Sequence, residues 1–527
     1  MMSIGKLSAG QEAYYLEEVL DGREDYYLSA GEAPGRWTGR LAQRVGLAGD
    51  VEADALRAVL AGHDPTGTYK LRSTTASLPG YDLTLSAPKS VSLIWGLGDP
   101  EVAATVIAAY EGAVDDALAY LESAACHVRR GRGGVEQAPG SGLLAAAFRH
   151  RTSRAGDPDV HTHVLVANMT EGPDGRWTAL DGRGIYHHAR TAGFVYQTRL
   201  RHELARDLGV VFGEVTKGYA DIVGVPDELR VAMSTRRHQI LAAMAGWDAH
   251  SAKGAQAAAL DTRTAKSGHV NEDELRTRWA GQAAGHSFTI DTLPHAEPGP
   301  TVGPSAELLA RRVTEKDATF ERRDVVRAVA EMAWQGTTLD DINRHVDAFV
   351  SSAHVVPVRD GGWTTREILD LERATIRRAV RTSRAGCGTI GIDTVRAHRA
   401  QHQHLGPDQW QAALHMTREG GTISVVIGPA GSGKTTTLDV ARQMWEDAGY
   451  HVIGAALAAK AASELTNGAH IPATTADRLL SQLRRQQTRL DEHTVVVVDL
   501  CRHARHPPTR RYRRAHRQRR GEARARR

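Results

Sequence analysis

The chain has 527 residues, of which 41% are hydrophobic and 24% charged, a composition typical of a globular protein and not of a disordered or fibrous one. Its length exceeds what one hydrophobic core supports, so we expect three or four domains. Three dispersed cysteines, Cys126, Cys387 and Cys501, exclude a disulfide framework and a multi-cysteine zinc site. The first residues have no apolar signal-peptide core and no apolar run reaches membrane-spanning length, so we expect a cytoplasmic location.

The net charge of +4 comes from one end of the chain. Residues 501–527 contain twelve arginines and one acid, and without them 54 basic and 61 acidic residues remain, a net of −7. The bulk charge therefore gives no evidence that the body of the chain binds DNA.

The first 170 residues predict alternating helices and strands. Residues 8–11 resemble a capping box, and the residues after them predict a helix through Leu20. Residues 81–95 alternate polar and apolar side chains as a half-buried strand does, and 101–122 predict a long helix. Two further strands, 143–150 and 161–168, are joined by a turn at 154–158. Because no repeated strand–helix–strand unit is present, we predict an α+β domain with an antiparallel, palm-like sheet.

Composition divides the rest of the chain. Residues 250–268 predict a surface helix, and the Pro/Gly-rich residues 293–304 predict a linker. Short helices and a strand pair between residues 319 and 382 resemble a winged-helix module, and from about 405 the pattern becomes strand, glycine loop and helix. The expected borders are, in order, 1–295 for the first domain, 296–318 for the linker, 319–385 for the winged-helix-like module, 386–499 for an incomplete P-loop α/β lobe and 500–527 for a disordered Arg-rich tail.

Three histidines form the most informative cluster in the sequence. His161 and His163 are two residues apart on an expected strand, so both side chains project from one face. His150 on the preceding strand can reach the same face. Three neutral imidazoles hold a divalent cation and leave coordination positions open, as in a catalytic metal site. The alternative is a chance pair among 25 histidines, as His187, His188 and His202 are expected to be.

Paired tyrosines and one aspartate are further candidates. Tyr14-Tyr15 and Tyr26-Tyr27 offer phenols, which become nucleophiles beside a cation or a general base. Their alternative role is aromatic packing. Asp82 at the start of a strand can orient a ligating histidine, although it can also be an ordinary strand-end aspartate.

With these residues in view, the sequence resembles the MobF-type conjugative relaxases (TrwC/TraI-like), a branch of the HUH endonucleases. The resemblance covers residues 1 to about 218 closely and extends loosely to 499. It depends on residues 3–7, the tyrosine pairs, the segment 82–90 and, most of all, the string HRTSRAGDPDVHTH at 150–163.

The resemblance implies a metal-dependent enzyme that nicks one DNA strand at a plasmid transfer origin and starts conjugative transfer. By resemblance, Tyr14 attacks the scissile phosphodiester to give a 5′-phosphotyrosine, Tyr26 serves a second strand transfer, and Tyr15 and Tyr27 are secondary. The family's Mg²⁺ or Mn²⁺ ligands correspond to His150, His161 and His163, and its histidine-orienting acid to Asp82.

The expected partners are single-stranded or hairpin origin DNA and accessory relaxosome and coupling proteins. Lys89, Arg149 and Arg154 are candidate phosphate contacts, or ordinary surface bases. Two other functions stay open at this point: a rolling-circle replication initiator, and a non-catalytic DNA- or ATP-binding remnant of a relaxase.

Residues 428–435 match the P-loop motif, with an expected strand at 422–427 before them. Lys434 is expected to reach the β- and γ-phosphates of ATP, and Thr435 to bind Mg²⁺. The backbone N–H groups that would cradle the phosphates belong to Gly428, Gly431, Ser432 and Gly433.

Two more residues complete the expected nucleotide site. Residues 494–499 predict a buried strand that ends at Asp499, which is placed to bind Mg²⁺. Gln409 resembles the adenine-reading glutamine of superfamily 1 helicases. Leu500 follows where that family has a catalytic glutamate, so we expect helicase activity to be lost. We read residues 500–527 as the product of a shifted reading frame, with a basic nucleic-acid-binding arm as the alternative.

Overall fold

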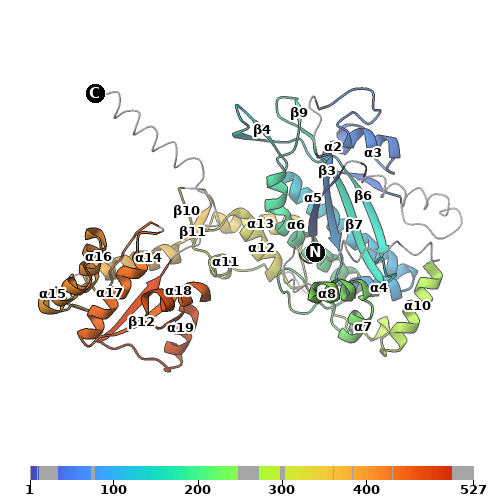
Figure 1. Ribbon diagram of the computed structural model, residues 1–527. Coiled ribbons are helices and arrows are strands. Elements are labelled where there is room, and N and C mark those ends of the chain that lie inside the picture. Colours follow the sequence, from blue (N-terminus) through green and yellow to red (C-terminus); the bar gives the residue numbers. More distant parts are fainter. Residues whose placement is uncertain are drawn as a thin grey trace. The chain divides into compact units, whose positions relative to one another are not determined.

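The structure is a computed structural model that describes residues 2–8, 10, 34–72, 78–246, 254, 272–296, 303–359, 361–382, 385–429 and 431–500. It consists of two compact units, Met1–Ile368 and Leu369–Arg527, coloured from blue to red along the chain in Figure 1. The helix expected after residue 11, most of the helix expected at 250–268 and the tail after Leu500 lie outside the described residues.

A five-stranded antiparallel sheet forms the centre of the first unit, which confirms the predicted α+β class. Its strands lie in the order β1-β3-β7-β6-β2, so the two histidine-bearing strands are neighbours inside the sheet. Their bounds are Met2–Lys6 (β1), Arg36–Thr38 (β2), Gly80–Ser86 (β3), Ala145–Thr152 (β6) and Pro158–Ala167 (β7).

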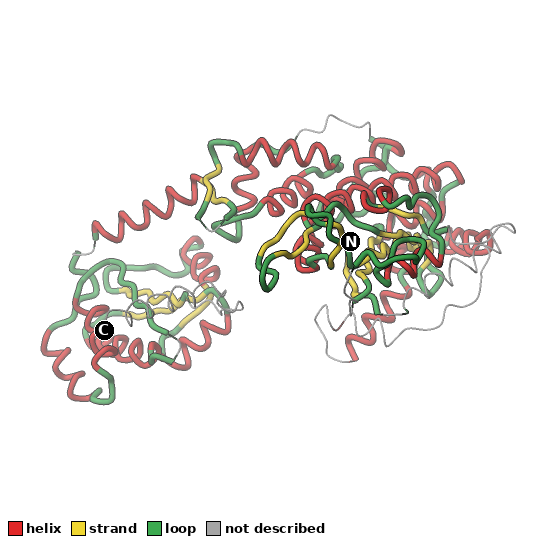
Figure 2. The backbone as a smooth tube through the Cα atoms, turned by 90° about the horizontal axis from the view of Figure 1, so that it is seen from above, coloured by secondary structure: helices red, strands yellow, loops and turns green. Residues whose placement is uncertain are grey.

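One face of this sheet is covered by long helices. Alternate residues of β3 and β7, such as Leu83, Leu85 and Val164, are fully buried in the core that these helices share with the sheet. The helices are α4 (Lys89–Leu97), α5 (Pro100–Ala124) and α6 (Gly182–Leu208), and α5 confirms the long helix expected at 101–122. Figure 2, with helices in red and strands in yellow, shows helices alongside the strands of each unit.

The opposite face carries a smaller core at one end. Phe148 and Leu165 pack there with residues from β2, α2 (Arg40–Arg44) and α3 (Ala53–Leu60). Towards the other end, the same face presents His150, His161 and His163. The apolar core therefore covers one half of this face, and the histidines lie on the other half.

The strand expected over residues 81–95 ends earlier than its alternation suggested. β3 stops at Ser86, and α4 begins at Lys89, directly after Pro88. Residues 90–96 are all buried. A short buried run of this kind occurs both in enclosed helices and in strands, so burial alone does not distinguish the two. Pro88 decides the matter because proline fits the start of a helix and interrupts a strand ladder.

The turn between β6 and β7 is held from outside the sheet. Helix α10 (Glu272–Ala284) places Trp279, which is fully buried, against the turn. The indole N–H of Trp279 donates to the carbonyl of Gly156 at 3.0 Å, and the ring meets Trp95 of α4 edge-on at 5.8 Å. The turn that connects the histidine strands is thus fixed to the helical layer.

Residues 303–368 belong to the first compact unit, although the sequence suggested a separate module beginning at 319. The guanidinium of Arg201 on α6 is buried and donates to carbonyl oxygens of Gly218 and Ala330, each at 3.0 Å, and of Ala333 at 3.3 Å. Gly336 lies so close to α6 that a Cβ would sit 2.2 Å from the carbonyl oxygen of Thr198. These contacts join the segment to α6, and its winged-helix identity stays a prediction.

From residue 319 on, the helices and the strand pair are those expected from the sequence: α12 (Arg322–Met332), α13 (Leu339–Val350) and the antiparallel pair β10 (Val355–Pro357) and β11 (Trp363–Thr365). Helix α11 (Ala306–Val313) was not expected, because it lies within residues 296–318, which were predicted to be a linker. Helix α14 (Arg366–Arg381) crosses the border between the units. The remaining elements of the first unit are β4 (His127–Arg130), β5 (Glu136–Pro139), β8 (Thr170–Glu171), β9 (Trp177–Thr178), α7 (Asp227–Ala232), α8 (Thr235–Gly246) and η1 (Ile290–Thr292).

The second unit contains a three-stranded parallel sheet in the order β13-β12-β14. Its core includes Met444 and Trp445 of α17 and Val452 of β12. The elements are α15 (Ile392–Gln401), α16 (Pro407–Arg418), α17 (Lys434–Asp447), β12 (His451–Ala456), α18 (Ala459–Ala469), β13 (Ala473–Thr475), α19 (Ala476–Arg484) and β14 (Thr494–Asp499).

Two predictions for this unit were wrong. Residues 422–427 form no strand, and their side chains are exposed, 68% for Val425 and 93% for Ile427. β14 is a strand, as expected, but it is not buried, since Val498 is 51% exposed. An apolar strand is stable only with neighbours that pair its backbone groups, and within the described residues segment 422–427 pairs with no strand.

Among the described helices, none has the length and apolar character needed to cross a membrane.

Candidate metal centre and nucleotide-binding loop

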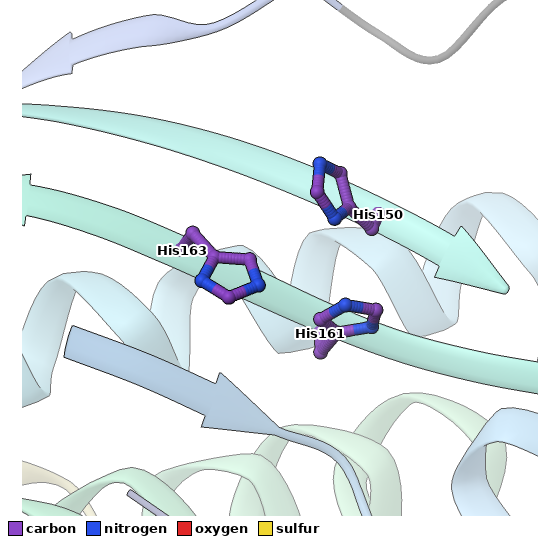
Figure 3. A group of neighbouring side chains, drawn as sticks. All are labelled: His150, His161 and His163. Carbon is purple, nitrogen blue, oxygen red and sulfur yellow. The ribbon is translucent and has the colours of Figure 1, made fainter. Parts of the chain in front are cut away.

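The three histidines converge because of the register of β6 and β7. His150 is directly opposite His161 in the ladder, and His163 is opposite Phe148, one pair further along on the same face. Figure 3 shows the three rings gathered on one side of these two strands. One ligand nitrogen from each ring lies within 4.8 Å of the others, and the ring centroids are 5.1–5.4 Å apart.

His163 is oriented by Asp82 on the adjacent strand β3. Its Nδ1 is 2.9 Å and 3.0 Å from the two carboxylate oxygens of Asp82. The hydroxyl of Thr84 lies 3.3 Å from the same nitrogen. A carboxylate on Nδ1 favours the tautomer that carries its proton there, and in that tautomer the lone pair that can bind a cation is on Nε2.

His161 is oriented by a backbone carbonyl instead. Its Nδ1 lies 2.8 Å from the carbonyl oxygen of Asp159, so a proton on Nδ1 donates to that oxygen. The side-chain carboxylate of Asp159 is farther away, at 3.8 Å. His161 and His163 thus reach the same tautomer through two different partners.

Burial keeps His161 suited to bind a cation. It lowers the pKa of His161, Asp159 raises that pKa, and His150 and His163 lower it. A lowered pKa means that the imidazole of His161 is neutral at neutral pH, and a metal ligand must be neutral. His150 is 6% exposed.

These residues fit a divalent cation. Three imidazole nitrogens at mutual ligand distance, two of them with their second nitrogen oriented by an acceptor, form a three-ligand site with open positions. Neutral ligands leave the full charge of the cation available to a phosphate oxygen. Within the described residues, no other group of three or more His, Cys, Asp or Glu side chains comes this close together.

The three candidate phosphate contacts have different surroundings. Arg149 forms an ion pair with Glu111 of α5, on the face of the sheet away from His150. The ammonium of Lys89 donates to the carbonyl oxygen of Pro158 at 2.6 Å. Arg154 is half-buried in the turn after β6. The charged groups of Arg149 and Lys89 are therefore already bound to other groups of the protein.

The candidate nucleophiles Tyr14 and Tyr26, with Tyr15 and Tyr27, lie outside the described residues. Their roles stay predictions from the sequence. His188, expected to be a bystander, lies on α6, where its Nδ1 forms a hydrogen bond with the hydroxyl of Tyr120 at 2.8 Å.

In the second unit, Lys434 is the first residue of α17, and Gly433 before it has a left-handed backbone with φ of 76°. The Lys434 ammonium donates to the carbonyl oxygens of Gly428 and Pro429, each at 2.8 Å. The loop thus surrounds the start of a helix, where N–H groups and the helix dipole favour a phosphate.

Gln409 lies against this loop. Its amide nitrogen donates to the carbonyl oxygen of Ser432 at 3.0 Å, and its amide oxygen accepts from the N–H of Gly406, also at 3.0 Å. Thr435 is exposed, and Asp499 ends β14, opposite Ala456 of β12. Gln409 thus lies beside the loop, and its adenine-reading role stays a prediction, whereas residues 422–427 in front of the loop do not form the expected strand.

Sequence reasoning missed three residues that position the cluster: Thr84, Asp159 and Trp279. Thr84 could have been found, because it is two residues from Asp82 on the same face of a strand. The carbonyl of Asp159 and the contact of Trp279 with Gly156 depend on backbone geometry and on a distant helix. No local sequence pattern predicts either of these two contacts.

Comparison with known proteins gives two family matches. The TrwC relaxase model matches residues 9–286, which is slightly more than half of the chain, and an AAA domain model matches residues 404–518.

Curated relatives are considerably longer than this chain. The multifunctional conjugation protein TraI of Escherichia coli (strain K12) is 31% identical over 411 residues, which cover 72% of this chain and 22% of TraI. The probable conjugal transfer protein TraA of Sinorhizobium fredii is 30% identical over 207 residues, 37% of this chain and 18% of that protein. The chain thus spans about a fifth of the length of these relatives. A solved structure of conjugative relaxase TrwC in complex with oriT DNA is 32% identical and covers 55% of this chain and 99% of its own, with a TM-score of 0.49.

Proposed function

Because this chain belongs to the TrwC relaxase family, we propose that its first unit nicks one DNA strand at a transfer origin and starts conjugative transfer. The observation that carries the proposal is the cluster of His150, His161 and His163 inside the region that matches the family. Such a cluster is what a metal-assisted phosphodiester cleavage needs.

In the proposed reaction, the phenolic oxygen of Tyr14 attacks the scissile phosphorus. The bond from phosphorus to the 3′ oxygen breaks, which gives a 5′-phosphotyrosine and a free 3′-OH. The covalent bond preserves the energy of the phosphodiester, so rejoining needs no ATP. Tyr26 would accept the strand in the second transfer of a round.

A Mg²⁺ or Mn²⁺ ion held by His150, His161 and His163 would supply a Lewis acid that polarises a non-bridging phosphate oxygen. Asp82 keeps the Nε2 of His163 turned to the site by accepting from Nδ1. The carbonyl of Asp159 does the same for His161. The two residues thus set the ligand geometry before DNA binds, which is what pre-organised catalysis requires.

The proposed substrate is single-stranded or hairpin origin DNA, and the proposed partners are accessory relaxosome and coupling proteins. Membership in the family supports both. The relatives named for conjugation, TraI and TraA, are consistent with this assignment. We place the activity in the cytoplasm, where plasmid DNA is nicked.

For the second unit we propose ATP–Mg²⁺ binding at residues 428–435. The support is the AAA domain match and the position of Lys434 at the start of α17, beside Gln409. Thr435 and Asp499 would hold the Mg²⁺ ion.

A covalent-adduct assay tests the proposed nicking. The full chain is incubated with labelled single-stranded DNA that covers the region flanking its gene, with Mn²⁺ or Mg²⁺ or with chelator. We expect a protein–DNA adduct that forms only with the metal, because the cation stabilises charge on the phosphate. Tyr14→Phe should abolish it and Tyr15→Phe should largely keep it. Cleavage in chelator, or an undiminished adduct with Tyr14→Phe, contradicts the proposal.

A further inference from the structure

The ladder between β6 and β7 is irregular next to the histidine cluster. His150 faces His161, but Thr152 faces Pro158, so two steps along β6 correspond to three steps along β7. The extra residue on β7 is a β-bulge at residues 159–160. A bulge removes a residue from regular pairing and turns its backbone groups in a new direction.

At the bulge, the carbonyl oxygen of Asp159 has a side-chain partner, His161. In a regular ladder, each such carbonyl is occupied by the facing strand or points to the next one. Here the Asp159 oxygen accepts from Nδ1 of His161 at 2.8 Å. The direction of the His161 ring therefore depends on how firmly residues 158–160 are held.

The segment around the start of α4 holds those residues at three points. The N–H of Ala87 donates to the carbonyl oxygen of Val160 at 2.9 Å. The hydroxyl of Ser92 accepts from the N–H of Val160 at 3.1 Å. The ammonium of Lys89 donates to the carbonyl oxygen of Pro158 at 2.6 Å. The contacts at Pro158 and Val160 lie on either side of Asp159 along the strand.

Of the three contacts, only that of Lys89 comes from a side chain able to carry charge. Burial lowers the pKa of Lys89, whereas Asp159 and Asp157 raise it. A half-buried ammonium loses hydration and needs a close acceptor in return, and the carbonyl of Pro158 is that acceptor. The ammonium of Lys89 is thus bound to the backbone of the strand that carries His161.

We propose that Lys89 is a positioning residue for the metal ligand His161, acting through the carbonyl of Pro158 and the bulge at Asp159. The inference depends on the proposed function, since it assigns a role within the same metal site. It replaces the phosphate contact that the sequence suggested for Lys89. His163, oriented by Asp82 on β3, does not depend on this contact.

Metal affinity measured on the full chain tests the proposal. Lys89→Met keeps the length of the side chain and removes the ammonium, Lys89→Arg keeps a donor, and Lys70→Met changes an exposed lysine as the control. Mn²⁺ affinity, the absorption spectrum of bound Co²⁺, thermal unfolding and single-stranded DNA affinity in chelator at two salt concentrations are measured for each.

We expect Lys89→Met to weaken Mn²⁺ binding about tenfold, in the range found when groups that orient metal ligands are removed. The Co²⁺ spectrum should change, Lys89→Arg should recover part of the affinity, and Lys70→Met should match the wild type. DNA affinity in chelator should not change. Unaltered Mn²⁺ affinity and Co²⁺ spectrum in Lys89→Met overturn the inference, as does weaker DNA binding with a smaller salt dependence.

A second variant serves if Lys89→Met does not fold. Ser92→Ala removes the acceptor of the Val160 N–H and should also weaken Mn²⁺ binding. A folded Ser92→Ala variant with unchanged affinity then overturns the inference. A wild-type chain that binds neither Mn²⁺ nor Co²⁺ contradicts the proposed function itself, which distinguishes the two failures.

Discussion

The two units present their candidate sites on very different supports. In the first, the histidines lie on neighbouring strands inside a five-stranded sheet, and the residues behind them, such as Leu83, are fully buried. In the second, the P-loop follows a segment that forms no strand and leaves Val425 and Ile427 largely exposed. A site on a strand ladder takes its geometry from the register of the strands. A site on a loop depends on the hydrogen bonds of the loop itself.

Those loop contacts are made by Lys434 and Gln409. A carbonyl that accepts from Lys434 competes with the phosphate that the same ammonium would bind. A phosphate at the proposed nucleotide site would therefore have to replace these internal contacts of Lys434.

The largest expected effect comes from measuring both activities, adduct formation and ATP binding, after one substitution in each unit. His163→Ala should reduce adduct formation by about 100-fold or more, because it removes a ligand from a three-ligand site. Lys434→Ala should abolish ATP binding and leave adduct formation unchanged. Adduct yield and binding of a fluorescent ATP analogue are the measurements. If Lys434→Ala reduced nicking as much as His163→Ala does, the two sites would not be independent, contrary to the prediction.

Truncating one apolar side chain in each unit tests the same difference in packing. Leu83→Ala removes a fully buried side chain from the first unit and should lower its free energy of unfolding by about 2–5 kcal/mol. Val425→Ala removes a side chain that is 68% exposed and should cost less than about 0.5 kcal/mol. Urea unfolding of the full chain measures both. A cost above about 1 kcal/mol for Val425→Ala would show that segment 422–427 is packed in solution.

The smallest expected effect concerns pH and the first unit alone. Burial lowers the pKa of His188 to about 4, and His187 and Arg323 lower it as well. The unfolded chain, with a histidine pKa near 6.5, binds this proton first as the pH falls. Stability that is present above about pH 6.5 is therefore lost progressively down to about pH 4.

His188 is partly solvated, so we expect a loss of about 1–2 kcal/mol after allowance for screening. Urea unfolding of the first unit at pH 7 and pH 4.5, for the wild type and His188→Gln, measures it. The variant should show a smaller difference between the two pH values. An equal difference in both proteins would mean that His188 does not titrate as its surroundings imply.

Sequence patterns predicted the parts of the first site that depend on alternation along strands. The two-residue spacing of His161 and His163 puts them on one face, and the turn at 154–158 brings His150 opposite His161. The bulge at Asp159 was not predictable, because any residue can occupy a bulge and the contact uses its carbonyl. The role of Lys89 was hidden for a similar reason, since its partner is a backbone oxygen.

In the second unit the apolar run at 422–427 predicted a strand that did not form. Periodicity reports which side chains prefer burial, but a strand also needs neighbours in the sheet. The contact between α6 and the segment after residue 303 is likewise made by a distant residue, the buried Arg201, and no local pattern predicts it.

In the proposed site, three imidazoles hold a divalent ion within reach of the nucleophilic tyrosine. Anomalous diffraction at the manganese edge, from crystals of the chain grown with Mn²⁺ and uncleaved origin DNA, tests it most directly. We expect one manganese peak coordinated by His150, His161 and His163, with a phosphate between it and the Tyr14 hydroxyl. A peak elsewhere, or a Tyr14 hydroxyl too distant to attack that phosphate, would contradict it.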